Sequence, residues 1–439
     1  MSAAPPSRDE IAALVEPGRV HRRVYTDPAI FALEQERIFR RLWVFVGHES
    51  RIPNRGDFLR ARIGETEILV VRQADGTISG LHNRCTHRGA QLCVAAQGNV
   101  RTFVCPYHGW AFRLDGSLIG VPLPDGYGDG IDAKRADWRL ARVPRLDSYR
   151  GFMFASLAAD GVSLIEHLSG ITRAFDNMID RSPDGVLEQH PHCFSQEFRG
   201  NWKLHMENAT DTVHPMFVHE SSVEAGRKYD GDGPEELPQA VQMFRANGLP
   251  LAEWDRVGIH AYPTGHVYMC GFYRAGTIAP QRQDPVFDAY RRQLVTRHGE
   301  TKTTEILAMD RFNNLIFPNL SINPRFQVLR QVHPIAADRT VATSHCFRLA
   351  GAPPEIARLG LRFLNTTNSP ASLISSDDLE IFARVQAGLA RSDSPWVDFS
   401  RGLGTERPGG EDEATRAPGT AEAAMRAQYR AWLAAMTAP

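Results

Sequence analysis

The chain has 439 residues, 42% of them hydrophobic, with 50 lysines and arginines against 51 aspartates and glutamates. This length suits about two or three domains with a large core, and the near-neutral charge gives no basic field that would favour nucleic acid or an anionic membrane surface. Apolar runs, such as residues 68–71, are too short to span a bilayer, and the N-terminus lacks the pattern of a signal peptide. We therefore expect a cytoplasmic protein that binds neither nucleic acid nor a membrane.

The first predicted element is a helix over residues 27–46. Asp27 is a suitable N-cap, Pro28 suits the first helical position, and apolar residues recur after them at helical spacing. We expect residues 1–45 to form a helical segment that packs on the C-terminal domain.

From about residue 46 to 155 the pattern changes to short strands and turns. Residues 67–72 and 100–104 are rich in β-forming side chains, and the Asp-Gly pairs at 75–76 and 115–116 are typical of hairpin turns. The segment 46–155 is therefore predicted to be a small antiparallel β domain.

Two loops of this β domain each offer one cysteine and one histidine: Cys85 and His87 in the first, Cys105 and His108 in the second. This set suits a [2Fe–2S] cluster in which one iron takes two cysteines and the other takes two histidines. Zinc accepts the same atoms and is the alternative, but zinc sites usually pair cysteine with cysteine and histidine with histidine within a loop. The mixed loops favour the cluster.

Beyond residue 160 we expect a larger antiparallel sheet flanked by helices. Helices are predicted over 164–179, 201–218, 376–390 and 421–436, and strands over 192–198, 265–273, 319–322, 326–333 and 340–347. The stretch 401–419 is rich in glycine, proline and charge, which predicts a mobile loop. The fold class is therefore α+β, with the small β domain followed by a helix-flanked antiparallel-sheet domain over 156–439.

The helix over 201–218 carries a candidate second metal site. Asp211 and His214 are three residues apart and share a helical face. His214 and His219 are five apart, which separates them by about 140° on a straight helix. Pro215 lies between them and gives the helix a reason to bend, so that both histidines can reach one atom.

Two histidines need a carboxylate to complete the facial triad that binds non-haem Fe(II). Asp377 and Asp378 stand side by side at the start of the helix over 376–390. Residue chemistry does not choose between them, and a pair of acids that only caps a helix N-terminus is the alternative.

Two sets of motifs, taken together, are typical of one enzyme family. The first comprises Cys-Thr-His-Arg-Gly at 85–89 and Cys-Pro-Tyr-His-Gly-Trp at 105–110, and the second comprises Asn-Trp-Lys at 201–203 with the Asp-x-x-His-x4-His spacing of 211–219. Through them the chain resembles the large (α) subunit of a Rieske non-haem iron aromatic-ring-hydroxylating oxygenase. The resemblance implies a Rieske [2Fe–2S] domain over 46–155 and a catalytic domain with a mononuclear Fe(II) over 156–439.

The resemblance also implies roles for single residues. Asp378, rather than Asp377, corresponds to the iron carboxylate, which joins the two histidines as metal ligands. Asp211 resembles the aspartate that bridges an iron-ligand histidine, here His214, and a cluster histidine of a neighbouring subunit, here His108. Asn208 resembles the asparagine beside the iron.

Candidate substrate contacts follow from proximity to the ligands. Met216, Phe217 and Ile374 are candidates for the pocket wall, with ordinary core packing as the alternative for each. Arg330, in the strand over 326–333, could bind a substrate carboxylate if it points inward, and would be a surface arginine if it points outward. His205 is expected to be an ordinary packed residue of its helix.

The activity implied by the resemblance is that of a terminal oxygenase component. It would use O2 and two electrons to hydroxylate an aromatic substrate, by cis-dihydroxylation, with an aromatic carboxylate as a candidate substrate. The chain has no G-x-G-x-x-G dinucleotide fingerprint, so a ferredoxin or flavin reductase using NAD(P)H must supply the electrons. The resemblance also implies an α3 core, with α3β3 as the form that includes a small β subunit.

Two other functions are compatible with parts of the pattern. Monooxygenation or oxidative demethylation of an aromatic ether or amine would use the same metals. A non-catalytic Rieske electron carrier would need only the cluster, and the presence of His214, His219 and Asp378 counts against it.

Overall fold

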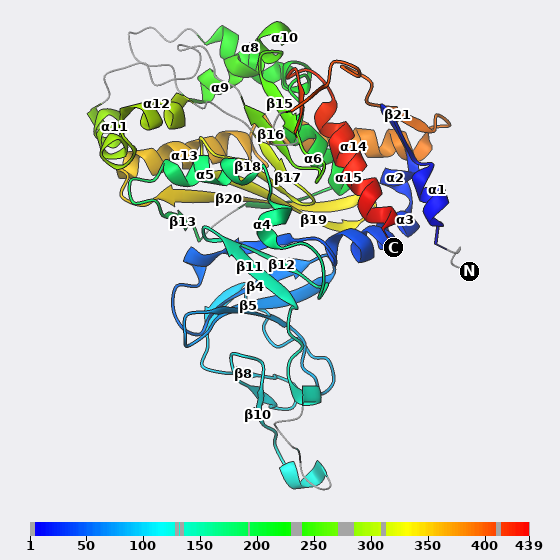
Figure 1. Cartoon of the computed structure of the whole chain (residues 1–439), viewed down its shortest axis with the longest axis vertical. Coiled ribbons are helices and arrows are strands. Elements are labelled where there is room, and N and C mark those ends of the chain that lie inside the picture. Colours follow the sequence, from blue (N-terminus) through cyan, green and yellow to red (C-terminus); the bar gives the residue numbers. More distant parts are fainter. Residues whose placement is uncertain are drawn as a thin grey trace. The chain divides into compact units, whose positions relative to one another are not determined.

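The computed structural model describes residues 5–127, 131, 136–191, 194–229, 239–270, 285–308, 313–409 and 414–438. The chain divides into two compact units, one over Gln35–His167 and the other over Met1–Glu34 together with Leu168–Pro439. Both mix helices with antiparallel sheet, as expected for the α+β class (Figure 1). No helix among these residues is both long enough and apolar enough to span a bilayer.

The smaller unit is built from three antiparallel sheets, with strand orders β6-β5-β4-β7, β11-β12-β3 and β10-β9-β8. The strands are β3 (Val44–His48), β4 (Asp57–Ile63), β5 (Thr66–Arg72), β6 (Ile78–His82), β7 (Gln97–Asn99), β8 (Phe103–Val104), β9 (Ala111–Phe112), β10 (Leu118–Gly120), β11 (Arg145–Tyr149) and β12 (Phe152–Ser156). Short helical segments are the π-helix η1 (Gln35–Phe39), the 3-10 helices η2 (Glu49–Arg51), η3 (Pro124–Tyr127) and η4 (Ala136–Trp138), and α4 (Leu164–His167). The Asp-Gly turn at 75–76 joins β5 to β6, and the one at 115–116 joins β9 to β10, as predicted.

The larger unit is organised around one sheet with the order β13-β20-β19-β18-β17-β16-β15-β23-β22, and β14 also pairs with β20. Its strands are β13 (Leu187–Gln189), β14 (Phe194–Phe198), β15 (Gly258–Ala261), β16 (Val267–Cys270), β17 (Asn314–Ile316), β18 (Leu320–Asn323), β19 (Val328–Ala336), β20 (Arg339–Leu349), β22 (Arg407–Pro408) and β23 (Thr415–Ala417). A second small sheet joins β1 (Val15–Glu16), β2 (Arg19–His21) and β21 (Trp396–Asp398).

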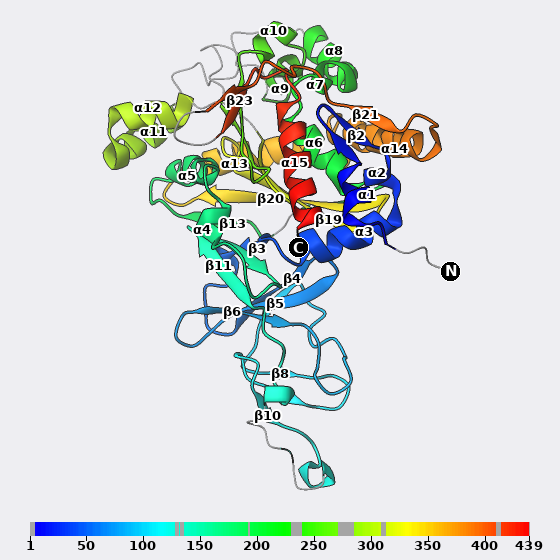
Figure 2. The same cartoon turned by 45° about the vertical axis from the view of Figure 1, so that its right-hand side comes forward.

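Helices surround the large sheet and connect its strands (Figure 2). They are α1 (Arg8–Ala12), α2 (Arg23–Thr26), α3 (Pro28–Glu34), α5 (Thr172–Asp180), α6 (Trp202–Thr210), α7 (His214–Val218), α8 (Glu220–Lys228), α9 (Gln239–Asn247), α10 (Leu251–Trp254), α11 (Pro285–His298), α12 (Glu300–Ala308), α13 (Pro354–Thr367), α14 (Ser375–Arg391) and α15 (Ala423–Thr437). The C-terminal helix α15 packs against both α1 and α6, so the two ends of the chain meet beside α6.

A buried ion pair connects α6 to both ends of the chain. Lys203 Nζ lies 2.5 Å from Glu34 Oε1, and neither side chain is exposed. The indole N–H groups of Trp202 and Trp432 donate to the same carboxylate at 2.9 and 2.7 Å. Because removal of one partner would leave a buried charge uncompensated, this pair fixes α6 firmly between α3 and α15.

Four predicted elements differ from the observed ones. The helix predicted over 27–46 ends at Phe39, and Val44–His48 forms β3 instead, where β-branched and aromatic residues pair with β12. The helix predicted over 164–179 is divided into α4 and α5.

The helix predicted over 201–218 is interrupted between Thr210 and His214. The loop predicted over 401–419 contains β22 and β23, of which β23 pairs with β15. Parts of three predicted segments, namely residues 192–193, 271–273 and 410–413, lie outside the described residues.

Candidate functional site

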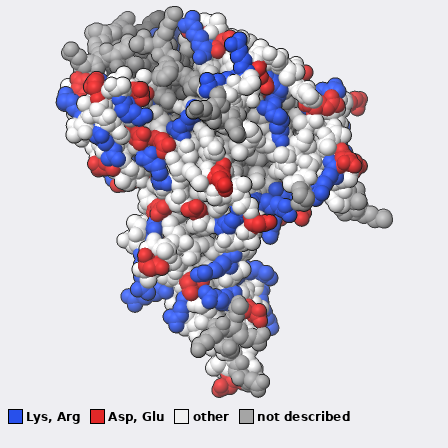
Figure 3. Space-filling view, in the orientation of Figure 1, with Lys and Arg blue, Asp and Glu red and all other residues white. Residues whose placement is uncertain are grey.

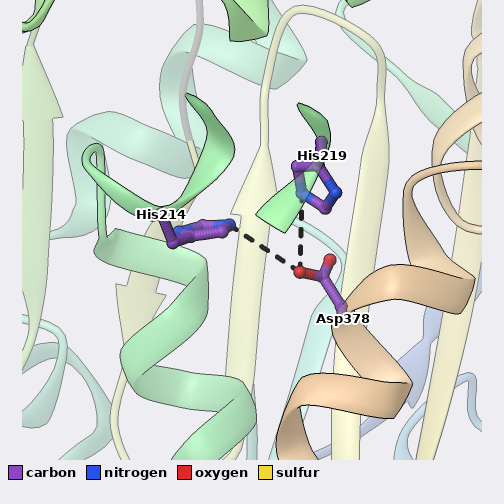
Figure 4. Close-up of side chains that lie close together, drawn as sticks. All are labelled: His214, His219 and Asp378. Carbon is purple, nitrogen blue, oxygen red and sulfur yellow. Dashed lines mark ion pairs between the residues drawn. The ribbon is translucent and has the colours of Figure 1, made fainter. Parts of the chain in front are cut away.

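Three side chains from two helical segments meet at one point of the larger unit (Figure 4). His214 begins α7, His219 is the C-cap of α7, and Asp378 lies in the first turn of α14. One ligand atom from each lies within 4.8 Å of the others. The Nε2 atoms of His214 and His219 are 3.7 and 3.5 Å from Asp378 Oδ1. Two imidazoles and one carboxylate converging in this way fit a facial triad for non-haem iron.

The helix interruption explains how two histidines five residues apart come together. Asp211, the C-cap of α6, is extended, with φ −85° and ψ 127°. Pro215 stands in the first turn of α7, where its missing N–H has no partner to lose. The direction of the chain therefore changes at Asp211, before the proline that was expected to bend it. The result is that the His214 and His219 rings lie 5.5 Å apart.

The neighbouring residues Asp377 and Asp378 contact different atoms of the histidines. Asp378 faces the Nε2 atoms of both histidines, whereas Asp377 Oδ2 lies 3.4 Å from Nδ1 of His219. A carboxylate on the second ring nitrogen fixes the tautomer and orientation of a metal-binding imidazole. Asp378 also accepts a hydrogen bond from Asn208 Nδ2 at 2.9 Å, and burial raises the pKa of Asp378.

Asp211 lies on the other side of His214. Its Oδ2 is 3.8 Å from His214 Nδ1, its Oδ1 accepts from the backbone N–H of Val213 at 2.7 Å, and Arg401 approaches to 3.8 Å. Burial raises the pKa of Asp211, while the Val213 hydrogen bond and the charge of Arg401 oppose that rise. The placement allows Asp211 to orient the His214 ring.

The two loops with mixed ligands have the same backbone construction. In each loop the cysteine N–H donates at 2.8 Å to the carbonyl five residues later, which is that of Ala90 in the first loop and Trp110 in the second. The N–H of the glycine four residues after each cysteine donates to the cysteine carbonyl at 3.0 Å. These glycines, Gly89 and Gly109, have φ of +78° and +69°, which other residues rarely adopt. The repeated turn presents both loops to a common centre in the smaller unit.

The four side chains of these loops fit a [2Fe–2S] cluster. Cys85 and Cys105 are buried free thiols, and the pKa of Cys85 is raised by burial and by the adjacent Cys105 thiol. The His87 and His108 rings lie 4.6 Å apart. Their Nδ1 atoms are buried and have no hydrogen-bond partner within the described part of the chain, which is the state expected of nitrogens that await a metal.

A cavity of about 90 Å³ opens on the triad, several times the space of about 10–15 Å³ that one water needs. The wall is a mixture of apolar and amide side chains, with Ile374 and Arg330 among them. Met216 and Phe217, which were expected there, do not line it, and the Phe217 side chain is 64% exposed. Both residues belong to α7, which begins after the interruption at Asp211.

His205 lines the cavity as well, although the sequence suggested only packing. It stands three residues before Asn208 on α6, so the two share a helical face. This three-residue spacing from Asn208 is the feature of the sequence that could have placed His205 in the cavity wall.

Comparison with known proteins agrees with both sites. Residues 42–143 match the Rieske [2Fe–2S] domain, and residues 186–438 match the catalytic domain of the ring-hydroxylating alpha subunit. The 2-halobenzoate 1,2-dioxygenase large subunit of Burkholderia cepacia is 33% identical, over 91% of this chain and 83% of the relative. The anthranilate 1,2-dioxygenase large subunit of Acinetobacter baylyi is 31% identical, over 88% and 80%.

Solved structures share the fold over almost the whole chain. A mutant naphthalene 1,2-dioxygenase bound to phenanthrene has a TM-score of 0.84 and 24% identity, over 97% of this chain and 94% of that one. Naphthalene 1,2-dioxygenase from Rhodococcus sp. has a TM-score of 0.79 and 28% identity, over 96% and 94%. With these matches, the chain belongs to the alpha subunits of Rieske ring-hydroxylating oxygenases, which carry a [2Fe–2S] cluster and a non-haem iron, use O2 and receive electrons from partner proteins.

Proposed function

We propose that this chain is the terminal oxygenase of a system that converts an aromatic carboxylate into a cis-dihydrodiol. The observation that carries this proposal is the cavity beside the triad, whose described lining contains one cationic side chain, Arg330. A guanidinium suits a carboxylate because it can bind both oxygens. Relatives named for 2-halobenzoate, anthranilate and toluate, which are aromatic carboxylates, support the same substrate class.

The metal ligands belong to the same proposal. Cys85, His87, Cys105 and His108 would hold the cluster, and His214, His219 and Asp378 would hold the iron. When bound, these groups supply the activation of O2 and the stored electron. The segments 46–155 and 156–439 would be the cluster and catalytic domains, and of the N-terminal segment 1–45 the part up to Glu34 belongs to the same compact unit as the catalytic domain.

The protein's own residues would prepare the site in three ways. Asn208 donates to Asp378 and keeps one carboxylate oxygen directed at the histidines. Asp377 lies against Nδ1 of His219, and Asp211 lies against Nδ1 of His214, so each ring is oriented for Nε2 to bind metal. The apolar part of the wall would hold the ring and exclude water from the reacting carbons.

The assembly that we propose is an α3 core, with α3β3 if a small β subunit is present. In that core Asp211 would bridge His214 and a cluster histidine of the neighbouring subunit, which would give electrons a short path between chains. A ferredoxin or a flavin reductase would bring the electrons from NAD(P)H.

The test is the product formed under 18O2 by the anaerobically purified holoenzyme, supplied with benzoate and a reductase system. The proposed reaction adds both atoms of O2, two electrons and two protons to one ring double bond, so the diol should contain two labelled oxygens. A product with one labelled oxygen would contradict dihydroxylation.

A second function, oxidative demethylation, is favoured by one specific relative. The N,N-dimethyl phenylurea N-demethylase alpha subunit of a Sphingobium strain is 37% identical over 48% of this chain and 46% of the relative. In the same assay, formaldehyde from an N-methylated aromatic substrate, with no diol from benzoate, would establish demethylation in place of dihydroxylation.

A further inference from the structure

His205 is a buried polar residue in the wall of the cavity. Its side chain is 6% exposed, and its ring stacks on Phe382 with centroids 5.8 Å apart and planes 25° apart. Nδ1 of this ring is buried and has no hydrogen-bond partner among the described residues. Since buried polar atoms are nearly always paired, a ring held in the wall with an unsatisfied nitrogen indicates a place where a ligand contributes the missing partner.

Arg330 lies within electrostatic range of His205. Burial is the main reason that the pKa of His205 is lowered to about 3, and the positive charge of Arg330 is the next cause. His205 is therefore a neutral imidazole with one N–H donor and one lone pair at neutral pH. Arg330 comes from β19 and His205 from α6, so the two reach the same cavity from different elements.

Arg330 also lies on the metal side of the cavity. It lines the same cavity as Asp378 and the two triad histidines. An anion bound to Arg330 would thus lie close to the triad. A carboxylate on the substrate ring is an anion of the right kind, because its two oxygens can accept from a guanidinium and from an imidazole N–H together.

We infer that His205 and Arg330 together form the subsite that binds the carboxylate of the substrate, Arg330 by charge and His205 by its N–H. The inference rests on the proposed function, since it assigns recognition within that same cavity. Phe382, which packs on the imidazole, holds the ring in place and so fixes the directions of its two nitrogens.

The first measurement uses the unmodified holoenzyme. Anaerobic calorimetry compares the binding of benzoate with that of benzamide, which has the same shape without the charge. The subsite predicts benzoate to bind at least about tenfold more tightly, the size expected of a charge-assisted hydrogen bond. Equal affinities would overturn the inference, even if the enzyme dihydroxylates benzoate.

Single substitutions then measure the contributions of Arg330 and His205 to benzoate binding separately. Arg330→Met should weaken benzoate binding by about ten- to a hundredfold, and His205→Phe, which keeps an aromatic ring against Phe382, by about three- to tenfold. Benzamide binding should change little in either. His205→Gln, which restores an N–H donor, should recover part of the benzoate affinity.

Two controls keep these results interpretable. Arg339→Met removes an exposed arginine from the adjacent strand β20, and should leave both affinities unchanged. Iron per chain is measured in every variant, because Arg330 and His205 line the same cavity as the iron ligand Asp378. If Arg330→Met and His205→Phe retain iron and weaken benzoate and benzamide equally, the subsite is wrong. If no labelled diol forms from benzoate in the unmodified enzyme, the proposed function itself is wrong.

Discussion

At the scale of single residues, the site depends on which ring nitrogen each carboxylate meets. Asp378 Oδ1 lies near Nε2 of both His214 and His219, while Asp377 lies near Nδ1 of His219. Neighbouring aspartates of the same helix thus have different tasks. One would bind the metal directly, and the other would orient a ligand.

This difference predicts unequal effects of two matched substitutions. Asp378→Asn should remove the mononuclear iron and leave the cluster intact. Asp377→Asn should keep most of the iron and weaken its binding by about ten- to a hundredfold, the usual effect of losing an outer partner of a metal ligand. Iron per chain after dialysis against a weak chelator measures both, and equal iron loss in the two variants would contradict the assignment.

The sequence indicates the ligand types more clearly than the substrate contacts. Cysteine and histidine in two short loops, and the spacing of 211–219, are local patterns that carry their chemistry with them. Met216 and Phe217 were candidates only from their nearness to the ligands along the chain, whereas the lining of a cavity depends on how separate elements such as α7 are directed. His205 and Arg330 meet only after α6 and β19 come together, which no local pattern contains.

At the scale of elements, α6 is the part on which the site is built. It connects to the N-terminal segment and α15 through two buried groups of polar side chains. One is the Glu34–Lys203 pair with its two tryptophans, and the other joins Glu207 to the hydroxyls of Tyr25 and Tyr429. The Tyr25 and Tyr429 hydroxyls also lie 2.5 Å apart.

Glu207, on α6, makes the free energy of unfolding depend on pH. Burial raises its pKa to about 7, against the opposing effects of both tyrosine hydroxyls and Lys203. Unfolding therefore releases a proton between the ordinary glutamate pKa of about 4.3 and about 7. The free energy of unfolding should fall across that window as pH rises, because the unfolded chain ionises first. Above about pH 7 the destabilisation from Glu207 is complete and no longer changes with pH.

Glu207→Gln, which keeps an oxygen for the tyrosine hydroxyls, tests this expectation. Denaturant unfolding at pH 5, 6, 7 and 8 should show the variant gaining stability relative to the unmodified protein as pH rises, by up to about 3 kcal/mol. Parallel curves for the two proteins would show that Glu207 does not titrate in this range.

Element boundaries show where sequence patterns stop being sufficient. Residues 44–46 were predicted to belong to a helix, yet 44–48 form β3, whose β-branched and aromatic residues suit a strand that pairs with β12. The glycine- and proline-rich stretch around 401–419 has little intrinsic structure, yet β23 adds to the large sheet and Arg401 pairs with Glu422. Long-range contacts decided both cases.

At the scale of the whole molecule, two units carry two metal sites with different chemistry. The smaller unit presents buried thiols and imidazoles from two equivalent turns, and the larger unit presents two imidazoles and a carboxylate beside a cavity. Positive and negative side chains are interspersed over the face shown in Figure 3, which agrees with the balanced charge of the sequence. The order of these sites along the chain and the α+β class were both predictable from motifs.

We expect one chain to hold a Rieske cluster on Cys85, His87, Cys105 and His108, and a mononuclear iron on His214, His219 and Asp378. Iron, zinc and acid-labile sulfide per chain, measured on anaerobically purified protein with electron paramagnetic resonance after dithionite reduction, test it most directly. We predict about three irons to two sulfides with a Rieske-type signal. About two irons to two sulfides, unchanged when Fe(II) is added, would contradict the triad and favour an electron carrier, and zinc without sulfide would contradict both sites.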